Sequence, residues 1–264
     1  MQRWGAYIAR PMARGSSKKL QLIVLGCGSI GQRHLRNLLA MGHSLIAQDP
    51  DPKRLTAVTD NLHVAGFLDL EQALSQPADA VLVCSPTSYH VSQAMQALQR
   101  GMHVFVEKPL SHTLAGTEDL ARLAEQKGLT VLMACNLRFF PSLCLVKELL
   151  DTGRVGRPLA ARIHGGFYLP YWRPGSDYRL GYGARLDLGG GVIQDFAHDL
   201  DYLCWFFGHP SEIFCWTGKL SSLEIDTEDV ASIQVRFPDG LVAQLQFDYL
   251  QPTYRRGMEV IGDQ

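Results

Sequence analysis

The chain has 264 residues with a formal net charge of −1, and 46% of its residues are hydrophobic and 19% charged. This composition is typical of a folded globular protein. It excludes a disordered chain and argues against nucleic acid as a partner. The six cysteines contain no C-x-x-C pair, so we expect reduced thiols and a cytoplasmic location. The length fits two domains.

Residues 1–19 contain basic side chains and no acidic ones, and they lack the apolar run of a secretory signal or a membrane span. We therefore expect a flexible leader and no membrane partner. A misplaced start and an organelle transit peptide are the alternatives.

The first predicted strand, residues 20–25, leads into a G-x-G-x-x-G sequence and a helix over residues 32–40. In that spacing Gly26 makes the tight turn, Gly28 lets the backbone approach a pyrophosphate, and Gly31 allows close helix–strand packing. We predict a dinucleotide site, with glycines that serve only a tight turn as the alternative. The residues of this predicted loop site are Gly26, Gly28, Ser29, Ile30 and Gly31.

A second predicted strand, residues 44–49, ends in Asp49, where a ribose 2′-hydroxyl needs an acceptor. A carboxylate there favours NAD, because it repels the 2′-phosphate of NADP. The nearby Lys53 and Arg54 keep NADP open, and we include Arg54 among the cofactor-binding residues.

Strands and helices continue to alternate up to residue 135, which predicts a doubly wound parallel sheet of the Rossmann type. Ligands bind such sheets at the carboxyl ends of the strands. The further strands are expected at residues 64–67, 78–84, 103–106 and 130–135, and the further helices at residues 52–58, 69–74, from His90, and 114–127. The residues at the expected strand ends are Ser85, Pro86 and Thr87 with His90, then Glu107 and Lys108, and Asn136. We include Ser85, Pro86, Thr87, His90 and Glu107 among the cofactor-binding residues.

The second half is richer in strands, with a composition change near residues 152–156. It predicts an α+β domain with a mostly antiparallel open sheet. We divide the chain into a leader (1–19), a dinucleotide-binding domain (20–140) and a substrate and oligomerisation domain (141–264). The expected elements are strands at 159–168 and 211–220, a hairpin of 230–237 with 241–249, and one helix over 192–207.

Lys108 follows a buried strand and precedes Pro109, which fixes the local turn. A lysine at a strand end is most often only solvated. On the ligand edge of the sheet, however, it is placed to hold a substrate hydroxyl and to stabilise an alkoxide as hydride leaves the carbon.

The predicted helix over 192–207 carries Asp195, His198 and Asp201 at i, i+3 and i+6. A histidine flanked by carboxylates on an otherwise apolar helix is a candidate general base. We predict catalytic roles for His198 and Asp195; a charge cluster on the helix surface is the alternative.

Residues 168–185 form a predicted loop dense in aromatic and charged side chains, among them Trp172, Arg173 and Tyr178. Aromatic rings stack on sugar faces and Arg binds carboxylate or phosphate, so these residues suit a sugar-like or anionic substrate. An oligomer or domain contact suits them nearly as well. The sequence has neither metal-ligand spacings nor G-x-S-x-G, so we expect no metal site and no serine hydrolase.

Several motifs follow one another along the chain. They are Gly26–Gly31 with His34, Ser85-Pro86-Thr87 before His90, Glu107-Lys108-Pro109, Asn136-Leu137-Arg138-Phe139, and Gly189-Gly190-Gly191 leading to His198 and Asp201. In this order they resemble the glucose-fructose oxidoreductase / inositol dehydrogenase / rhizopine catabolism family from about residue 20 to the C-terminus. The 172–179 block resembles a branch found with surface-polysaccharide and nonulosonic-sugar biosynthesis.

The resemblance implies a Rossmann domain, a second domain whose sheet often mediates dimers or tetramers, and NAD(P)-dependent redox chemistry on a sugar, cyclitol or nucleotide-sugar hydroxyl. It implies that Lys108 is the catalytic lysine and His198 the histidine acid/base. Many members place an aspartate four residues before that histidine, a position held here by Gln194, whereas Asp195 lies three before it. From the residues and the resemblance together, substrate contacts are expected from Lys108, Asn136, Arg138, Trp172, Arg173, Tyr178, Asp195 and His198.

Residues 256–264 resemble a point from which family members continue through further strands. We expect either a fragment or a shortened protein whose sheet edge another subunit covers. The expected function is an NAD(P)-dependent sugar dehydrogenase or reductase. A catalytically silent sugar- or dinucleotide-sensing protein and an NAD-dependent glycosidase are the alternatives.

Overall fold

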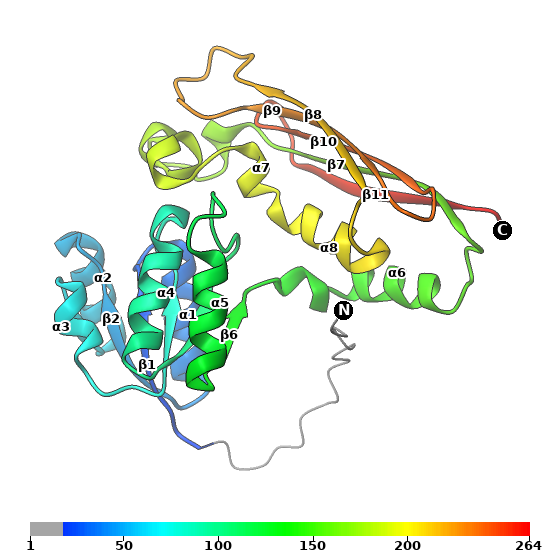
Figure 1. Ribbon diagram of the computed structural model, residues 1–264. Coiled ribbons are helices and arrows are strands. Elements are labelled where there is room, and N and C mark those ends of the chain that lie inside the picture. Colours follow the sequence, from blue (N-terminus) through cyan, green and yellow to red (C-terminus); the bar gives the residue numbers. More distant parts are fainter. Residues whose placement is uncertain (1–17) are drawn as a thin grey trace.

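The computed structural model describes residues 18–264; residues 1–17 of the predicted leader lie outside that part of the chain. Two sheets organise the chain, and helices α7 and α8 lie on the side of the second sheet that faces the first (Figure 1). Helix α6 connects the two halves of the chain (Figure 1).

The first sheet is wholly parallel with strand order β3-β2-β1-β4-β5-β6, which confirms the predicted doubly wound architecture. Its central strands are continuous apolar runs because helices cover both faces. Ile23, Val24 and Val81 accordingly have no exposed surface. The strands are β1 (Gln21–Leu25), β2 (Ser44–Gln48), β3 (Ala65–Phe67), β4 (Ala80–Val83), β5 (His103–Val106) and β6 (Val131–Met133), and the helices are α1 (Ser29–Ala40), α2 (Pro52–Leu62), α3 (Leu70–Leu74), α4 (His90–Gln99) and α5 (Thr117–Lys127).

The second sheet is mixed and mostly antiparallel, with order β11-β7-β10-β9-β8 and one parallel pair, β7 with β10. The predicted hairpin is present as β9 and β10. The burial of β10 alternates residue by residue up to Phe247, so one face of the sheet packs against helices and the other stays exposed. The elements are α6 (Pro141–Asp151), β7 (Pro158–Gly166), β8 (Glu212–Gly218), β9 (Val230–Arg236), β10 (Val242–Asp248) and β11 (Arg255–Gly262).

The predicted helix over 192–207 is broken in the structure, which corrects our expectation that one continuous helix carries Asp195 and His198. α7 (Val192–Asp195) and α8 (Ala197–Phe207) are separated by Phe196 at φ −90°, ψ 20°. The Phe196 ring stacks on Phe247 with centroids 5.0 Å apart. Tertiary packing at this residue therefore replaces the continuous helix that periodicity favours.

Short 3₁₀ turns form much of the region between the two sheets. They are η1 (Thr87–Tyr89), η2 (Asn136–Phe139), η3 (Leu169–Tyr171), η4 (Tyr178–Leu180), η5 (Tyr182–Ala184) and η6 (Leu186–Leu188). Turn η6 contacts η1, so the loop of the second domain meets the loop after β4. Across residues 18–264, no helix has the length and apolarity needed to cross a membrane.

Candidate active site

The glycine loop after β1 has the close packing that its spacing predicts. Gly26 has φ +92°, and a Cβ there would lie 2.8 Å from the backbone of Cys84. A Cβ on Gly31 would overlap with the carbonyl oxygen of Gly26, whereas a Cβ on Gly28 would meet nothing within 4 Å. The space beside Gly28 is therefore open, while Gly26 and Gly31 hold the turn against the helix.

The N-terminus of α1 fits a dinucleotide pyrophosphate. No side chain caps it, and its first turn contains no acidic residue. The free backbone N–H groups of the first turn and the helix dipole favour an anion at this point. Gly28, Ser29 and Ile30 would hold the pyrophosphate there.

Asp49 is buried at the end of β2, with only 3% of its surface exposed. Its Oδ2 accepts a hydrogen bond from the Cys27 backbone N–H at 2.7 Å, and its Oδ1 accepts one from that of Asp51 at 2.9 Å. The carboxylate therefore shapes the glycine loop, and it has further lone pairs with which it could accept from a ribose hydroxyl. Arg54 is exposed and lies 3.5 Å from Asp51.

His90 ties together the loops that follow β4 and β5. It is 2% exposed, with Nε2 lying 2.8 Å from the carbonyl oxygen of Ser85 and Nδ1 lying 2.8 Å from that of Pro109. Thr87 is buried beside it. The predicted Ser85-Pro86-Thr87 segment and Lys108 therefore lie on one edge of the sheet.

Glu107 is held by His34, a residue of α1 to which we had assigned no role at the site. His34 Nε2 lies 2.7 Å from Glu107 Oε1, and the Lys108 backbone N–H donates to Glu107 Oε2 at 3.3 Å. The pair joins the helix after the glycine loop to the strand end that carries Lys108.

Lys108 meets Asp195 through the backbone of the latter. Its Nζ donates to the Asp195 carbonyl oxygen at 2.7 Å, across 87 residues of sequence. Burial lowers the pKa of Lys108, and the carboxylates of Asp195 and Glu107 oppose that shift. The ammonium group is thus fixed at the edge where sheets of this kind bind ligands.

The Asp195 carboxylate accepts hydrogen bonds from two tyrosines that we did not predict. The Tyr182 hydroxyl donates to Oδ1, and the Tyr249 hydroxyl donates to Oδ2 at 2.5 Å. Burial raises the pKa of Asp195, against the opposing charge of Lys108. Tyr249 follows β10 and Tyr182 lies in the aromatic loop, so nothing local in the sequence pairs them.

His198 lies at the start of α8, with its Nδ1 buried and without a hydrogen-bond partner among the described residues. Burial, followed by the charges of Lys108 and Arg256, lowers the pKa of His198 to about 4. The imidazole is therefore neutral at physiological pH, as a general base must be.

This burial predicts a pH-dependent stability. An unfolded histidine gains a proton near its ordinary pKa of 6.5, whereas folded His198 does so only at about 4. The unfolded state binds more protons between those values, so the free energy of unfolding falls as the pH drops through this window. We expect His198→Gln to lose less stability than wild type between about pH 6.5 and about pH 5, measured by urea unfolding. An equal loss in both proteins would contradict this.

The three residues predicted in the aromatic loop, Trp172, Arg173 and Tyr178, differ in their contacts and exposure. Trp172 packs edge-on against Tyr249 at 5.5 Å and donates Nε1–H to the Phe167 carbonyl at 2.9 Å. The Tyr178 hydroxyl accepts the Glu224 backbone N–H at 3.2 Å. Arg173 is exposed. Of the three, Trp172 and Tyr178 serve the packing of the loop.

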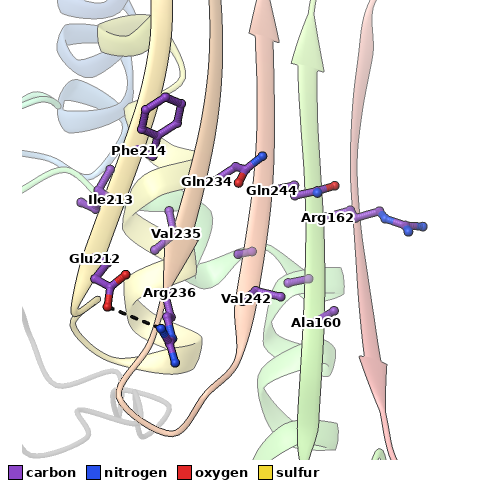
Figure 2. A pocket seen from close by; sticks show the side chains of 12 residues that line it. Ala160, Arg162, Glu212, Ile213, Phe214, Gln234, Val235, Arg236, Val242 and Gln244 are labelled. Atoms are coloured by element: carbon purple, nitrogen blue, oxygen red, sulfur yellow. Dashed lines mark ion pairs between the residues drawn. The ribbon is translucent and has the colours of Figure 1, made fainter.

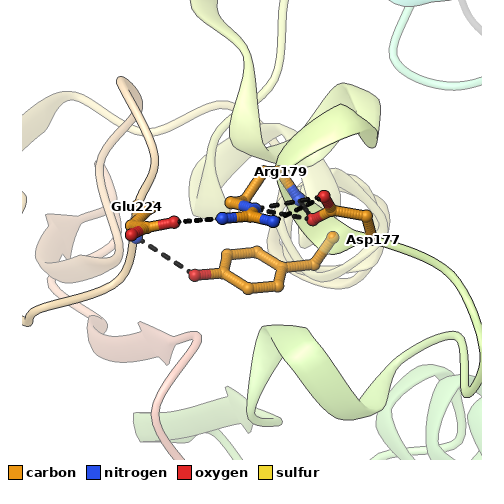
Figure 3. Close-up of polar contacts among 4 residues, drawn as sticks. Asp177, Arg179 and Glu224 are labelled. Atoms are coloured by element: carbon orange, nitrogen blue, oxygen red, sulfur yellow. Dashed lines mark hydrogen bonds and ion pairs between the residues drawn. The ribbon is translucent and has the colours of Figure 1, made fainter.

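Arg179 fastens the same loop to the segment before β9. It binds Asp177 at 2.8 Å and Glu224 at 2.6 Å, as Figure 3 shows. Asp226 and Thr227 extend this attachment, because they accept from the Leu186 N–H and donate to the Gly183 carbonyl, respectively. Contacts between segments that are distant in sequence therefore hold the aromatic loop in place.

Arg138 and Asn136 lie after β6. The Arg138 guanidinium binds Asp201 at 2.8 and 2.6 Å and lies 5.9 Å from the centre of the Trp205 ring. The charge of Arg138 is thus paired with that of Asp201. Asn136 is exposed. Across residues 18–264, no cluster of three or more His, Cys, Asp or Glu side chains is arranged to hold a metal ion.

Two family models match most of the chain. Residues 20–135 match the model described as "Oxidoreductase family, NAD-binding Rossmann fold", and residues 144–264 match the GFO/IDH/MocA C-terminal domain. The chain belongs to the GFO/IDH/MocA oxidoreductase family. Its first domain is an NAD-binding Rossmann domain, which agrees with the open glycine loop.

Similar proteins share both sequence and fold with this family member. The 1,5-anhydro-D-fructose reductase of Ensifer adhaerens is 31% identical over 77% of this chain, and the myo-inositol 2-dehydrogenase of Thermotoga maritima is 28% identical over 84%. The WlbA dehydrogenase of Bordetella pertussis, solved with NADH and UDP-GlcNAcA, superimposes with a TM-score of 0.85 at 23% identity, covering 93% of this chain and 78% of that one. The chain spans 61% of the length of the reductase and 66% of that of the inositol dehydrogenase.

Proposed function

We propose that the protein transfers hydride between NAD and a secondary hydroxyl or keto group of a sugar, cyclitol or nucleotide-sugar. The observation that carries this proposal is the placement of Lys108. Its ammonium donates to the Asp195 carbonyl oxygen at 2.7 Å and lies at the ligand-binding edge of an NAD-binding sheet. The neutral imidazole of His198 lies close enough for the charge of Lys108 to lower its pKa. The names of the similar reductase and inositol dehydrogenase support the substrate class.

NAD, when bound, supplies the group that accepts or donates the hydride. In the oxidative direction, Lys108 holds the substrate oxygen and stabilises the negative charge that develops on it. His198 takes the hydroxyl proton, and Nε2 is the nitrogen available for this because Nδ1 is buried. Asp195 keeps both the Lys108 ammonium and the tyrosine hydroxyls in position. In the reductive direction the same groups act in reverse.

The residues proposed to contact substrate are those predicted from the sequence, but the structure divides them into exposed residues and residues already hydrogen-bonded within the protein. Lys108 and His198 face the reacting oxygen, and Asn136 and Arg173 are exposed and free to contact more distant parts of the substrate. Arg138, Trp172, Tyr178 and Asp195 were also predicted to contact substrate, and their polar groups are hydrogen-bonded within the protein. A nucleotide-sugar of surface-polysaccharide metabolism is one member of the substrate class, supported by the resemblance of residues 172–179.

Asp49→Ala is expected to weaken NAD binding about tenfold, because it removes the acceptor for the ribose hydroxyl and the anchor of the Cys27 N–H. Calorimetric titration measures this, with NADP titrated in parallel. Arg122→Ala is the control: this arginine of α5 is exposed and pairs with Asp119, so NAD affinity should stay unchanged. Unchanged NAD affinity in Asp49→Ala would remove that residue from the site.

The proposed function is tested by following NADH absorbance with NAD and a panel of sugars, cyclitols and nucleotide-sugars. Net NADH formation with one class supports the proposal and names the substrate. Release of free sugar from a glycoside without net NADH supports an NAD-dependent glycosidase. Tight NAD binding without turnover of any compound supports a sensing protein.

Homo-oligomerisation through the second sheet is a further part of the proposal. The face of this sheet away from α8 is hollowed between β7 and β8, and Figure 2 shows Phe214, Val242 and Gln244 along it. Phe214 is 51% and Val242 49% exposed. Phe214→Glu should lower the molar mass in sedimentation experiments. Leu114→Glu, an 89% exposed control in the other domain, should leave it unchanged. A wild-type monomer would contradict this part.

We also propose a cytoplasmic location. All six cysteines lie in the described part of the chain, and each is a free thiol. Free thiols and NAD chemistry are both typical of a reducing compartment.

A further inference from the structure

A buried ion pair connects the strand β11 to the helix that carries His198. Asp199, the next residue after His198, has no exposed surface. The guanidinium of Arg256 in β11 donates to it through Nε at 3.1 Å and through Nη2. The Tyr202 hydroxyl donates to the same carboxylate at 2.5 Å. Asp199 is thus fully paired inside the protein, as a buried charge requires.

Arg256 also contacts the residue on the other side of His198. Its guanidinium carbon lies 5.8 Å from the centre of the Phe196 ring, and that ring stacks on Phe247 in β10. Arg256 therefore touches the chain both two residues before His198 and one residue after it. One side chain from β11 thus contacts both sides of the break between α7 and α8, where the imidazole is placed.

We propose that Arg256 is a positioning residue for His198: it anchors the start of α8 through Asp199 and keeps a fixed positive charge close to the imidazole. The catalytic significance of this inference rests on the proposed role of His198 as general base. A buried guanidinium near a histidine favours the neutral imidazole, which is the form that accepts a proton.

Two carboxylates near His198 act against Arg256 by raising the pKa of the imidazole, and each, like Arg256, has a partner of its own. Glu107 is bound by His34, and Asp201 by Arg138. Lys108 is the second cation that disfavours protonation of the imidazole. The charged groups on the surrounding elements are Lys108 and Glu107 after β5, Arg138 in η2, Asp195 in α7, Asp199 and Asp201 in α8, and Arg256 in β11.

The test is an NMR titration of the His198 ring, which needs no substrate. In wild type the His198 signals should stay those of a neutral ring from about pH 8 down to about pH 5. Arg256→Gln removes the charge but keeps a side-chain N–H for Asp199, and it should raise the titration midpoint by about one pH unit. Arg256→Lys keeps the charge, so its midpoint should stay low. The signal is assigned by its loss in His198→Asn.

Tyr202→Phe is the matched control, because it removes another hydrogen bond to Asp199 and leaves Arg256 in place. It should lower stability without moving the His198 midpoint. An unshifted midpoint in folded Arg256→Gln, or an equal shift in Tyr202→Phe, would overturn the inference. Should Arg256→Gln not fold, Asp199→Asn replaces it: the uncompensated guanidinium should keep the midpoint low, and a raised midpoint would overturn the inference.

A kinetic measurement adds the link to catalysis. The acidic limb of the pH profile of kcat/KM for alcohol oxidation should move to higher pH in Arg256→Gln and stay in place in Arg256→Lys. A limb that does not move while the NMR midpoint does would overturn the link to His198 as base. Absence of turnover in wild type would count against the proposed function, and the NMR titration would still decide the role of Arg256.

Discussion

Gly28→Ala is expected to weaken NAD binding severely while the protein remains folded. A Cβ at this position meets no protein atom within 4 Å, so the methyl group enters the open space beside the N-terminus of α1. That space is where the backbone must approach the pyrophosphate. We expect at least a hundredfold loss of NAD affinity, or about 2.7 kcal/mol, and a change in the free energy of unfolding within about 0.5 kcal/mol.

Gly31→Ala is the matched substitution three residues later, and its main effect should be a loss of folding stability. Its Cβ would overlap with the Gly26 carbonyl oxygen, a backbone atom that cannot move without opening the turn. We expect a loss of about 3 kcal/mol of stability, measured by urea unfolding without cofactor. Equal effects of the two substitutions on NAD affinity and stability would contradict our account of this loop.

Lys108→Ala is expected to lower kcat about a thousandfold, because it removes the only group that we assign to charge stabilisation on the substrate oxygen. NAD affinity should change little, since the dinucleotide loop is built by other residues. Steady-state kinetics with the substrate found in the panel, together with an NAD titration, measure both quantities.

Lys127→Ala is the control for this substitution, since its exposed ammonium only donates to the Gln99 carbonyl at the end of α4. It should retain wild-type turnover. A loss of less than tenfold in Lys108→Ala would show that hydride transfer does not depend on this lysine.

Much of the first domain was predictable because its signals are local. The apolar run before Gly26, the three glycines and the acidic end of β2 all lie within thirty residues of one another. Parallel strands buried on both faces are continuous apolar segments, so their positions along the chain could be inferred without knowing which helix covers which face.

The candidate site was only partly predictable, since its contacts join distant segments. Lys108 and His198 were recognisable from their motifs. The hydrogen bond from the Tyr249 hydroxyl to Asp195 joins residues 54 positions apart, and that from Arg256 to Asp199 joins residues 57 positions apart. Several acids and arginines were available as partners, and the sequence does not select among them.

The break at Phe196 was hidden for a related reason. The residues around it have helical spacing, and an isolated helix would continue through them. Two interactions from the second sheet interrupt the helix there, the stacking of Phe196 on Phe247 and the hydrogen bond from Tyr249 to Asp195. Tertiary packing therefore overrides helix propensity at the residues that position the His198 imidazole.

The most direct test of hydride transfer uses a substrate from the panel that carries deuterium on the carbon bearing the reactive hydroxyl. The account predicts that NADH accumulates and that each molecule formed carries one deuterium, because the hydride moves directly from that carbon to NAD. NADH that contains only solvent-derived hydrogen, or product formed without net NADH, would contradict the assignment of this site to alcohol oxidation.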